Sequence, residues 1–129
     1  MVALNFSPQF ADDVERRVKT CSIRITRRAN VGDRLQLFTG QRTKECRKLS
    51  AEDPVCVRVE HVAIRPHSLT IGDRTQTPDE RDAFAKLDGF PDYAAMHAWF
   101  SDRYSRRTFI GWLHVWHWPG TSFAAEGRQ

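Results

Sequence analysis

The sequence predicts an α+β fold in which a small curled sheet or barrel is flanked by short helices. The chain has 129 residues, which is the usual length of one domain. Segments of alternating polar and apolar residues, typical of strands, are interleaved with segments whose apolar residues recur at helical spacing. Neither a regular strand–helix–strand alternation nor an internal repeat is present. We therefore expect a small sheet with helices packed on it.

The first fifty residues predict one helix, two strands and a loop. A serine–proline pair at positions 7 and 8 is typical of a helix N-terminus, and we expect this helix over residues 8–18. Strict alternation over residues 21–26 predicts a half-buried strand, and a second strand follows over residues 34–38. Residues 39–48 are polar and predict a surface loop. The side chains expected to face the core are Phe10, Val14 and Val18 of the helix, Cys21, Ile23 and Ile25 of the first strand, and Leu35 and Leu37 of the second.

Three further strands are predicted in the second half of the chain. Valines alternate with other residues over positions 55–59, which predicts a strand with the valines inward. The apolar phase then shifts at Val62, which predicts a bulge near residues 60–61. Residues 69–71 predict a short strand. Residues 108–118 are aromatic on both faces, as expected of a strand buried between other elements.

Two helices are expected between the last two of these strands. Residues 77–80 read Thr-Pro-Asp-Glu, which fits a capping box with proline at the first helical position. Asp88 and Gly89 are expected to end that helix, with the glycine in a left-handed C-terminal position. A second helix is predicted over residues 93–104. Residues 119–129 are small and polar, and we expect them to form a flexible C-terminal tail.

Basic residues are concentrated in the first half of the chain. The whole chain has 20 Lys and Arg against 16 Asp and Glu, and residues 1–50 hold 11 of the basic but only 5 of the acidic residues. Such a block favours an anionic partner, with nucleic acid or a nucleotide the first candidates. A solvated arginine-rich surface has the same composition and is the alternative interpretation.

The protein is expected to be cytoplasmic. Its three cysteines form no C-x-x-C pair, which favours a reducing compartment over a disulfide framework. The N-terminus lacks the positive segment and apolar stretch of a secretory signal. No apolar run approaches the roughly 20 residues that a membrane span requires, so no membrane partner is expected.

Chemistry-bearing residues gather at the first predicted strand. Ser22 and Arg24 share its polar face and Lys19 lies where the preceding helix ends, so a hydroxyl, a guanidinium and an amine could converge. A lysine beside a second cation can take the proton of a serine, and an arginine can bind an oxyanion. The alternative is an ordinary polar strand face. Phosphate-binding glycine loops and nucleophile elbows are absent, and His114 and His117 fall on opposite strand faces, so no cofactor and no metal are expected.

Several motifs resemble, in order and spacing, the ASCH domain family. The resemblance covers about residues 3–118. The loop over residues 40–49 is similar to that of phage and prophage members. The motifs are Phe6–Phe10, Lys19-x-x-Ser22-Ile23-Arg24, Gly32-Asp33-x-Leu35-x-Leu37, Gly40-x-Arg42-Thr43-Lys44-x-Cys46-Arg47-Lys48-Leu49, Asp88-Gly89-Phe90 and Phe109-x-Gly111-x-Leu113-x-x-Trp116.

This resemblance implies a PUA-like fold, a small β-barrel flanked by helices, over residues 1–118. Small bacterial members of the family include amidohydrolases that deacylate N4-acetylcytidine with a Lys–Thr–Glu triad. Residue by residue, the triad corresponds here to Lys19, Ser22 and Asp88. Serine in place of threonine keeps the nucleophilic oxygen, and aspartate in place of glutamate is one methylene shorter. Family members often have glycine two residues before the lysine, where this chain has Arg17.

The leading hypothesis is therefore an amidohydrolase that cleaves the N4-acyl amide of a cytidine-type nucleoside. Lys19 would activate Ser22, Asp88 would orient Lys19, and Arg24 would stabilise the oxyanion. Because a base must be neutral while an ionised Asp88 favours the charged amine, burial and Arg24 must outweigh that attraction. We also expect the 39–48 loop to line the same cleft, with Lys44 and Arg47 contacting substrate.

Two alternatives remain open from the sequence. One is an RNA-binding PUA-like module, in which the cations of the 39–48 loop contact phosphates and Phe38 or Trp112 stacks on a base. The other is a metal-independent ribonuclease, a function of some relatives in the same family. An enclosed polar pocket at Lys19 and Ser22 would favour the hydrolase, whereas an open basic groove continuous with the loop would favour RNA.

Overall fold

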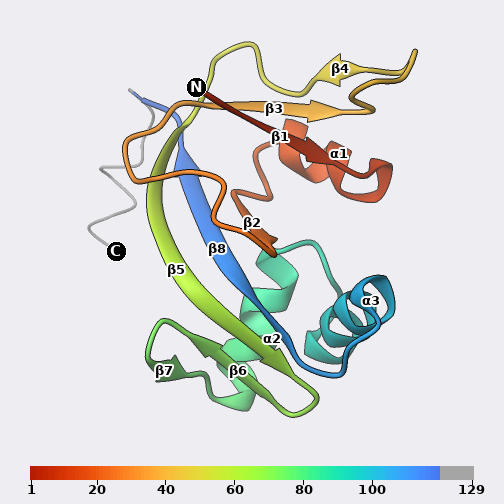
Figure 1. The fold of residues 1–129 in the computed structure, drawn as a ribbon, viewed down its shortest axis with the longest axis vertical. Helices are drawn as coiled ribbons and strands as arrows, with labels where there is room; N and C mark the ends of the chain where they lie inside the picture. Colours follow the sequence, from red (N-terminus) through yellow and green to blue (C-terminus); the bar gives the residue numbers. More distant parts are fainter. Residues whose placement is uncertain (120–129) are drawn as a thin grey trace.

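The computed structural model describes residues 1–119 and has an α+β architecture, as predicted (Figure 1). The predicted tail lies outside the described residues from position 120 onward. None of the helices in the described part is long and apolar enough to cross a membrane. In chain order the elements are β1 (Val2–Phe6), α1 (Pro8–Glu15), β2 (Cys21–Arg24), β3 (Leu35–Thr39), β4 (Arg47–Lys48), β5 (Val55–Arg65), β6 (Ser68–Ile71), β7 (Arg74–Thr75), α2 (Pro78–Leu87), α3 (Tyr93–Tyr104) and β8 (Phe109–His117).

The strands form two sheets, and within residues 1–119 their pairings do not close into the predicted barrel. One sheet has the order β1-β3-β4, with β1 parallel to β3, and the other has the order β2-β8-β5-β6-β7. The physical reason lies at β2, a strand of four residues that pairs with β8 but not with β1. Side chains bridge this seam instead, because Arg24 Nη2 donates to the Asn5 carbonyl of β1 at 2.9 Å.

Helix α1 is shorter than the 8–18 segment predicted from its apolar stripe. It ends at Glu15, and Arg17 takes a left-handed conformation with φ of 62°. The Asp13 carbonyl accepts the backbone N–H groups of both Val18 and Lys19, at 2.9 and 3.0 Å. This reversal leaves Val18 54% exposed, not in the core, and directs the next residue inward. Position 17, where members of the ASCH family often have glycine, thus has a positive φ, which glycine adopts most easily.

Strand β2 agrees with the alternation in part. Cys21 and Ile23 are buried as predicted, whereas Ile25 is 46% exposed because the strand ends at Arg24. In β5 the register shift lies between Cys56 and Arg58, not near residues 60–61. The burial at the start of β5 is also the reverse of the prediction, because Cys56 is fully buried and the flanking valines are half-buried.

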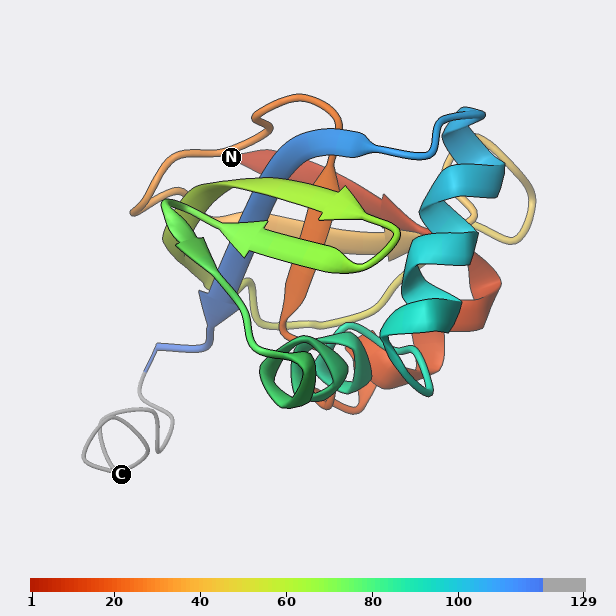
Figure 2. The same ribbon diagram turned by 90° about the horizontal axis from the view of Figure 1, so that it is seen from below.

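Helices α2 and α3 have the predicted bounds, and α2 also has the predicted capping. Thr77 and Glu80 form the capping box, and α3 begins after Asp92, whose carboxylate accepts the Ala95 N–H at 2.8 Å. Figure 2 shows α3 leading into the long strand β8, with α2 below the sheet. Contact between α1 and α3 is aromatic, with the Phe10 and Trp99 ring centroids 5.5 Å apart.

Gly111 of β8 is a position where the backbone of β2 and the ring of Phe109 leave no room for a side chain. An added Cβ would lie 2.6 Å from the Arg24 carbonyl oxygen and 2.6 Å from the Phe109 ring. Gly111→Ala is therefore expected to lower the free energy of unfolding by about 1–3 kcal/mol in urea denaturation. The neighbouring Ile110→Val, at an exposed position, is the control and should change it by less than about 0.5 kcal/mol. Equal losses in both variants would contradict the steric explanation.

Candidate active site

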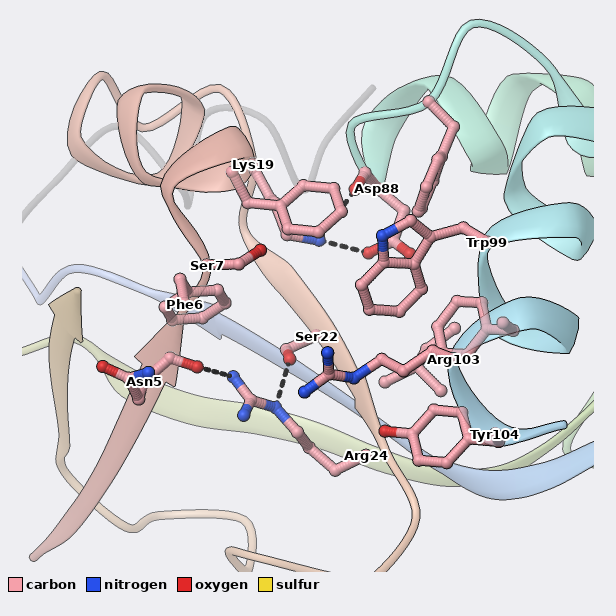
Figure 3. Close-up of a pocket in the computed structure, with 14 residues that line it drawn as sticks. Asn5, Phe6, Ser7, Lys19, Ser22, Arg24, Asp88, Trp99, Arg103 and Tyr104 are labelled. Atoms are coloured by element: carbon pink, nitrogen blue, oxygen red, sulfur yellow. Dashed lines mark hydrogen bonds and ion pairs between the residues drawn. The ribbon is translucent and has the colours of Figure 1, made fainter. Parts of the chain in front are cut away.

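A cavity of about 140 Å³ lies at the seam between β1 and β2. Its walls are largely aromatic and include Phe6, Phe10, Phe90 and Trp99. Figure 3 shows polar side chains from α3, β2 and the chain preceding β2 facing the same space. The volume is below the roughly 300–1,000 Å³ of sites for drug-sized ligands, so the cavity has room for one small planar group.

Lys19 and Asp88 form a buried ion pair in the wall of this cavity. They are 4% and 2% exposed, although 69 residues separate them in the chain. Lys19 Nζ donates both to the Asp88 carboxylate and, at 2.8 Å, to the Asp88 backbone carbonyl. The amine also lies 5.2 Å from the centroid of the Phe10 ring. Apolar surroundings strengthen such a pair and make the loss of either partner costly.

The end of helix α2 places Asp88 in this position. Asp88 is the C-terminal capping residue, and Gly89 follows with φ of 99°. A Cβ at Gly89 would lie 3.0 Å from the Phe10 ring, so glycine is required by both conformation and space. The carbonyl groups at a helix C-terminus carry partial negative charge, which adds to the attraction for Lys19. Asp88 therefore both ends the helix and binds the lysine.

Cys21 gives the Asp88 carboxylate a further neighbour. Its Sγ lies 3.5 Å from Asp88 Oδ1, within hydrogen-bond distance for sulfur. Burial, and then the negative charge of Asp88, raise the pKa of the Cys21 thiol far above its ordinary value. The thiol is therefore a neutral donor to the carboxylate.

Ser22 lines the same cavity, and its hydroxyl is held by Arg24. Arg24 Nε donates to Ser22 Oγ at 2.7 Å, so the two side chains share one face of β2 as the alternation predicted. Within the described residues, the hydroxyl makes no hydrogen bond to Lys19 or Asp88. The three residues expected as a triad thus share one cavity, with direct contact between Lys19 and Asp88 only. A cation on Oγ is well placed to stabilise a serine alkoxide.

His114 positions the backbone of Ser22 from the neighbouring strand. The Arg28 N–H donates to His114 Nε2 at 3.0 Å, so this nitrogen carries no proton. The proton is on Nδ1, which faces the Ser22 carbonyl at 3.4 Å. Burial lowers the pKa of His114, which keeps the ring neutral in this arrangement.

The cavity residues that were not site candidates from sequence include Asn5, Ser7, Trp99 and Arg103. Ser7 Oγ is buried without a hydrogen-bond partner in the described residues, and it does not cap α1 as its position before Pro8 predicted. Trp99 and Arg103 are one helical turn apart on α3, and that spacing was the available signal. The spacing does not show which residues face Trp99 and Arg103, because that depends on how α3 packs in the tertiary structure.

The 39–48 loop does not line the cavity, which corrects the expected roles of Lys44 and Arg47. Neither residue belongs to the cavity wall. Arg47 is on β4 and pairs with Glu15 of α1 at 2.7 Å, and Lys44 is exposed. The loop contacts cavity residues through Thr39, whose hydroxyl donates to the Phe6 carbonyl at 2.7 Å, and through Gln41, whose N–H donates to Asn5 Oδ1 at 3.0 Å. The antiparallel pairing of β4 with β3 turns the loop's charges toward α1 and solvent.

Comparison of the chain with protein-family models, with curated proteins and with solved structures finds no match. We therefore infer the chemistry of the site from the side chains that form it. In residues 1–119, no three His, Cys, Asp or Glu side chains lie close enough together to hold a metal ion. The groups that the cavity does bring together are a hydroxyl bound by a guanidinium, a buried amine–carboxylate pair, and aromatic walls.

Proposed function

We propose that the protein is an amidohydrolase that cleaves the N4-acyl amide of a cytidine-type nucleoside, releasing cytidine and acetate from N4-acetylcytidine. The observation that carries this proposal is the meeting of Lys19, Ser22 and Asp88 in one small cavity, from three segments of the chain. Polar groups of this kind are rarely buried unless they are paired, and buried clusters of titratable groups in a cleft are typical of active sites. Membership of the ASCH family and a PUA-like fold are part of the same proposal.

Shape and lining favour a small aromatic amide as substrate. A pyrimidine ring with a short acyl group suits a cavity of about 140 Å³ with Phe6, Phe90 and Trp99 in its walls, because planar rings stack favourably on aromatic side chains. The Ser7 hydroxyl, which has no hydrogen-bond partner among residues 1–119, offers a donor or acceptor for the polar edge of the ring. The sugar extends from the mouth of the cavity.

The reaction begins with proton transfers that the ion pair makes possible. Transfer of one proton from Lys19 to Asp88 gives a neutral amine and a neutral acid, and the neutral amine can then act as a base. The amine takes the proton of Ser22 as Oγ attacks the acyl carbon and the carbonyl electrons move onto oxygen. The guanidinium of Arg24, already bound to Oγ, stabilises the negative charge that develops on Oγ as its proton leaves.

Two bond exchanges complete the turnover. The tetrahedral intermediate breaks its carbon–nitrogen bond, and the leaving N4 amine receives the proton held by Lys19, which releases cytidine. Water then attacks the acyl group on Ser22, giving one proton to Lys19, and the carbon–oxygen bond to Ser22 breaks. Lys19 returns that proton to Ser22 Oγ, and the acyl group leaves as acetic acid, which loses its proton to solvent to give acetate. Asp88 then returns its proton to Lys19, which restores the ion pair. The sum is hydrolysis of one amide by one water.

The direct test is incubation of the purified protein with N4-acetylcytidine, with cytidine release followed by chromatography. We expect turnover in the presence of a metal chelator, because the steps above need no metal. Brief acid quenching should trap an acylated protein whose added mass is one acetyl group, located on Ser22 by peptide mass spectrometry. Absence of cytidine release by folded protein would contradict the proposal. Release without a trapped acyl group, even at the earliest times, would favour direct attack by water.

A second candidate, RNA binding through the 39–48 loop, has less support. Arg47 and Lys48 are already paired with Glu15 and Asp53, at 2.7 and 2.9 Å. The proposed stacking residue Trp112 is occupied by His61, with ring centroids 3.8 Å apart. These contacts reduce the charge and aromatic surface that the loop and β8 could offer to RNA.

A further inference from the structure

Positive charge exceeds negative charge in the lining of the cavity. Its ionisable groups with a fixed charge are Lys19, Arg24 and Arg103 against Asp88. Lys19 and Asp88 neutralise each other in their buried pair. Two guanidinium groups therefore remain, and in the described part of the chain neither forms an ion pair with a carboxylate.

The two guanidinium groups differ in what they bind. Arg24 is committed, because its Nε donates to Ser22 and its Nη2 donates to the Asn5 carbonyl. Burial, and next the positive charge of Arg28, lower the pKa of Arg24 to about 10, so the group is still charged at neutral pH. The Arg103 guanidinium makes no hydrogen bond to any other residue within positions 1–119. Its guanidinium carbon instead lies 5.4 Å from the Trp99 ring centroid and 5.9 Å from that of Tyr104.

The position of Arg103 is at the mouth of the cavity. The residue is exposed on the last turn of α3, and Figure 3 shows its side chain extending from that helix toward Ser22. Stacking on aromatic rings orients the planar guanidinium while leaving its N–H donors free. A pyrimidine and acyl group inside the cavity would place the sugar and its substituent at this mouth. A guanidinium there is suited to bind a phosphate with two parallel hydrogen bonds.

We propose that the preferred substrate is a nucleoside monophosphate, an N4-acylated CMP, whose phosphate binds Arg103. This inference rests on the proposed function and names the substrate class of the same site. Arg103, a cation at the mouth with no ion pair to any residue that the structure describes, matches one phosphate, and the loop cations that a longer RNA would need lie outside the cavity. An incoming phosphate would also offset the repulsion between the two guanidinium groups.

The experiment compares kcat/KM for the 5′-monophosphate of N4-acetylcytidine with that for N4-acetylcytidine. Charge-assisted hydrogen bonds lead us to expect a preference of about 10- to 100-fold for the monophosphate, decreasing as salt is raised. Arg103→Met should reduce this preference to near one, and Arg103→Lys should keep part of it. Arg106→Met removes the same charge just beyond α3 at an exposed residue outside the cavity wall, so it should keep the full preference.

Binding of the products separates this inference from the proposed function. Calorimetric titration with CMP and with cytidine measures the phosphate contact without catalysis, and the same 10- to 100-fold difference and Arg103 dependence are expected. If neither acylated substrate is hydrolysed, the proposed function fails while the titration still decides the phosphate contact. Equal binding and equal hydrolysis of both forms would overturn the inference. So would parallel losses on both substrates in Arg103→Met, or faster deacylation of N4-acetylcytidine within a short RNA.

Discussion

Replacing Ser22 with alanine is expected to lower the rate of N4-acetylcytidine hydrolysis by about 10³-fold or more. The hydroxyl is the only group of the protein that forms a bond to the acyl carbon in the proposed mechanism. Lys19→Met should cause a loss of similar size, and the double variant should be no worse than either, because a nucleophile and its base act as one unit. Ser22→Thr should retain activity, since the oxygen keeps its place and a β-branched residue suits a strand. Initial rates of cytidine release measure all four.

The matched control is Ser50→Ala. Ser50 is also buried, and its hydroxyl accepts a hydrogen bond from Trp118 Nε1 at 2.9 Å, away from the cavity. Ser22→Ala loses one hydrogen bond, whereas Ser50→Ala loses two, because Ser50 Oγ also donates to the Glu52 carbonyl at 2.6 Å. The stability of Ser50→Ala should therefore fall by at least as much as that of Ser22→Ala, at about 1 kcal/mol for each bond. Only Ser22→Ala should lose activity. A Ser22→Ala variant as active as Ser50→Ala would exclude the serine as nucleophile.

Replacing Asp88 with alanine is expected to lower the free energy of unfolding by about 3–5 kcal/mol. The change leaves the Lys19 amine buried without its counter-charge, and it also removes the acceptor for the Cys21 thiol. Urea denaturation followed by circular dichroism measures the loss. The control is Asp12→Ala, which breaks a solvent-exposed pair with Arg16 and should cost less than about 1 kcal/mol.

A double variant separates the structural role of this pair from its catalytic role. Lys19→Met combined with Asp88→Leu removes both charges and fills their space with apolar atoms, which is expected to recover most of the stability lost in Asp88→Ala. The double variant should nevertheless be inactive, because it has no base. Full activity in the recovered variant would show that the pair serves stability alone. Failure to recover stability would indicate that the loss in Asp88→Ala does not come from the unpaired charge of Lys19.

The sequence correctly placed Ser22 and Arg24 together, because their relation depends only on residues that are close in the chain. Ser22 and Arg24 are two residues apart on a strand, so the alternation alone places them on one face. Asp88 came from a resemblance in motif order, since no local pattern relates it to Lys19 across 69 residues. The shorter carboxylate is no obstacle to contact, because the left-handed turn at Gly89 and the end of α2 bring Asp88 onto the lysine.

Elements with strong local signals were predicted well. The capping box at Thr77 and Glu80 and the bounds of α3 depend on residues within one or two turns of each other, and the structure confirms them. Burial of Val18 and Ile25 was wrong because the periodic pattern continues beyond the point where the helix and the strand end. A local pattern of apolar residues has no information about where the chain turns to meet another segment.

Features of longer range were decided by tertiary structure. The pairing of β1 with β3 and the seam it leaves beside β2 create the cavity, and α3 adds Arg103 to its mouth. These depend on contacts between segments tens of residues apart, whose free energies come from shared burial and side-chain bridges rather than from periodicity. The same contacts turn the 39–48 loop away from the cavity through the Arg47–Glu15 ion pair. Local composition could therefore identify the hydroxyl, the amine and the basic loop, but only packing decided which of them share a site.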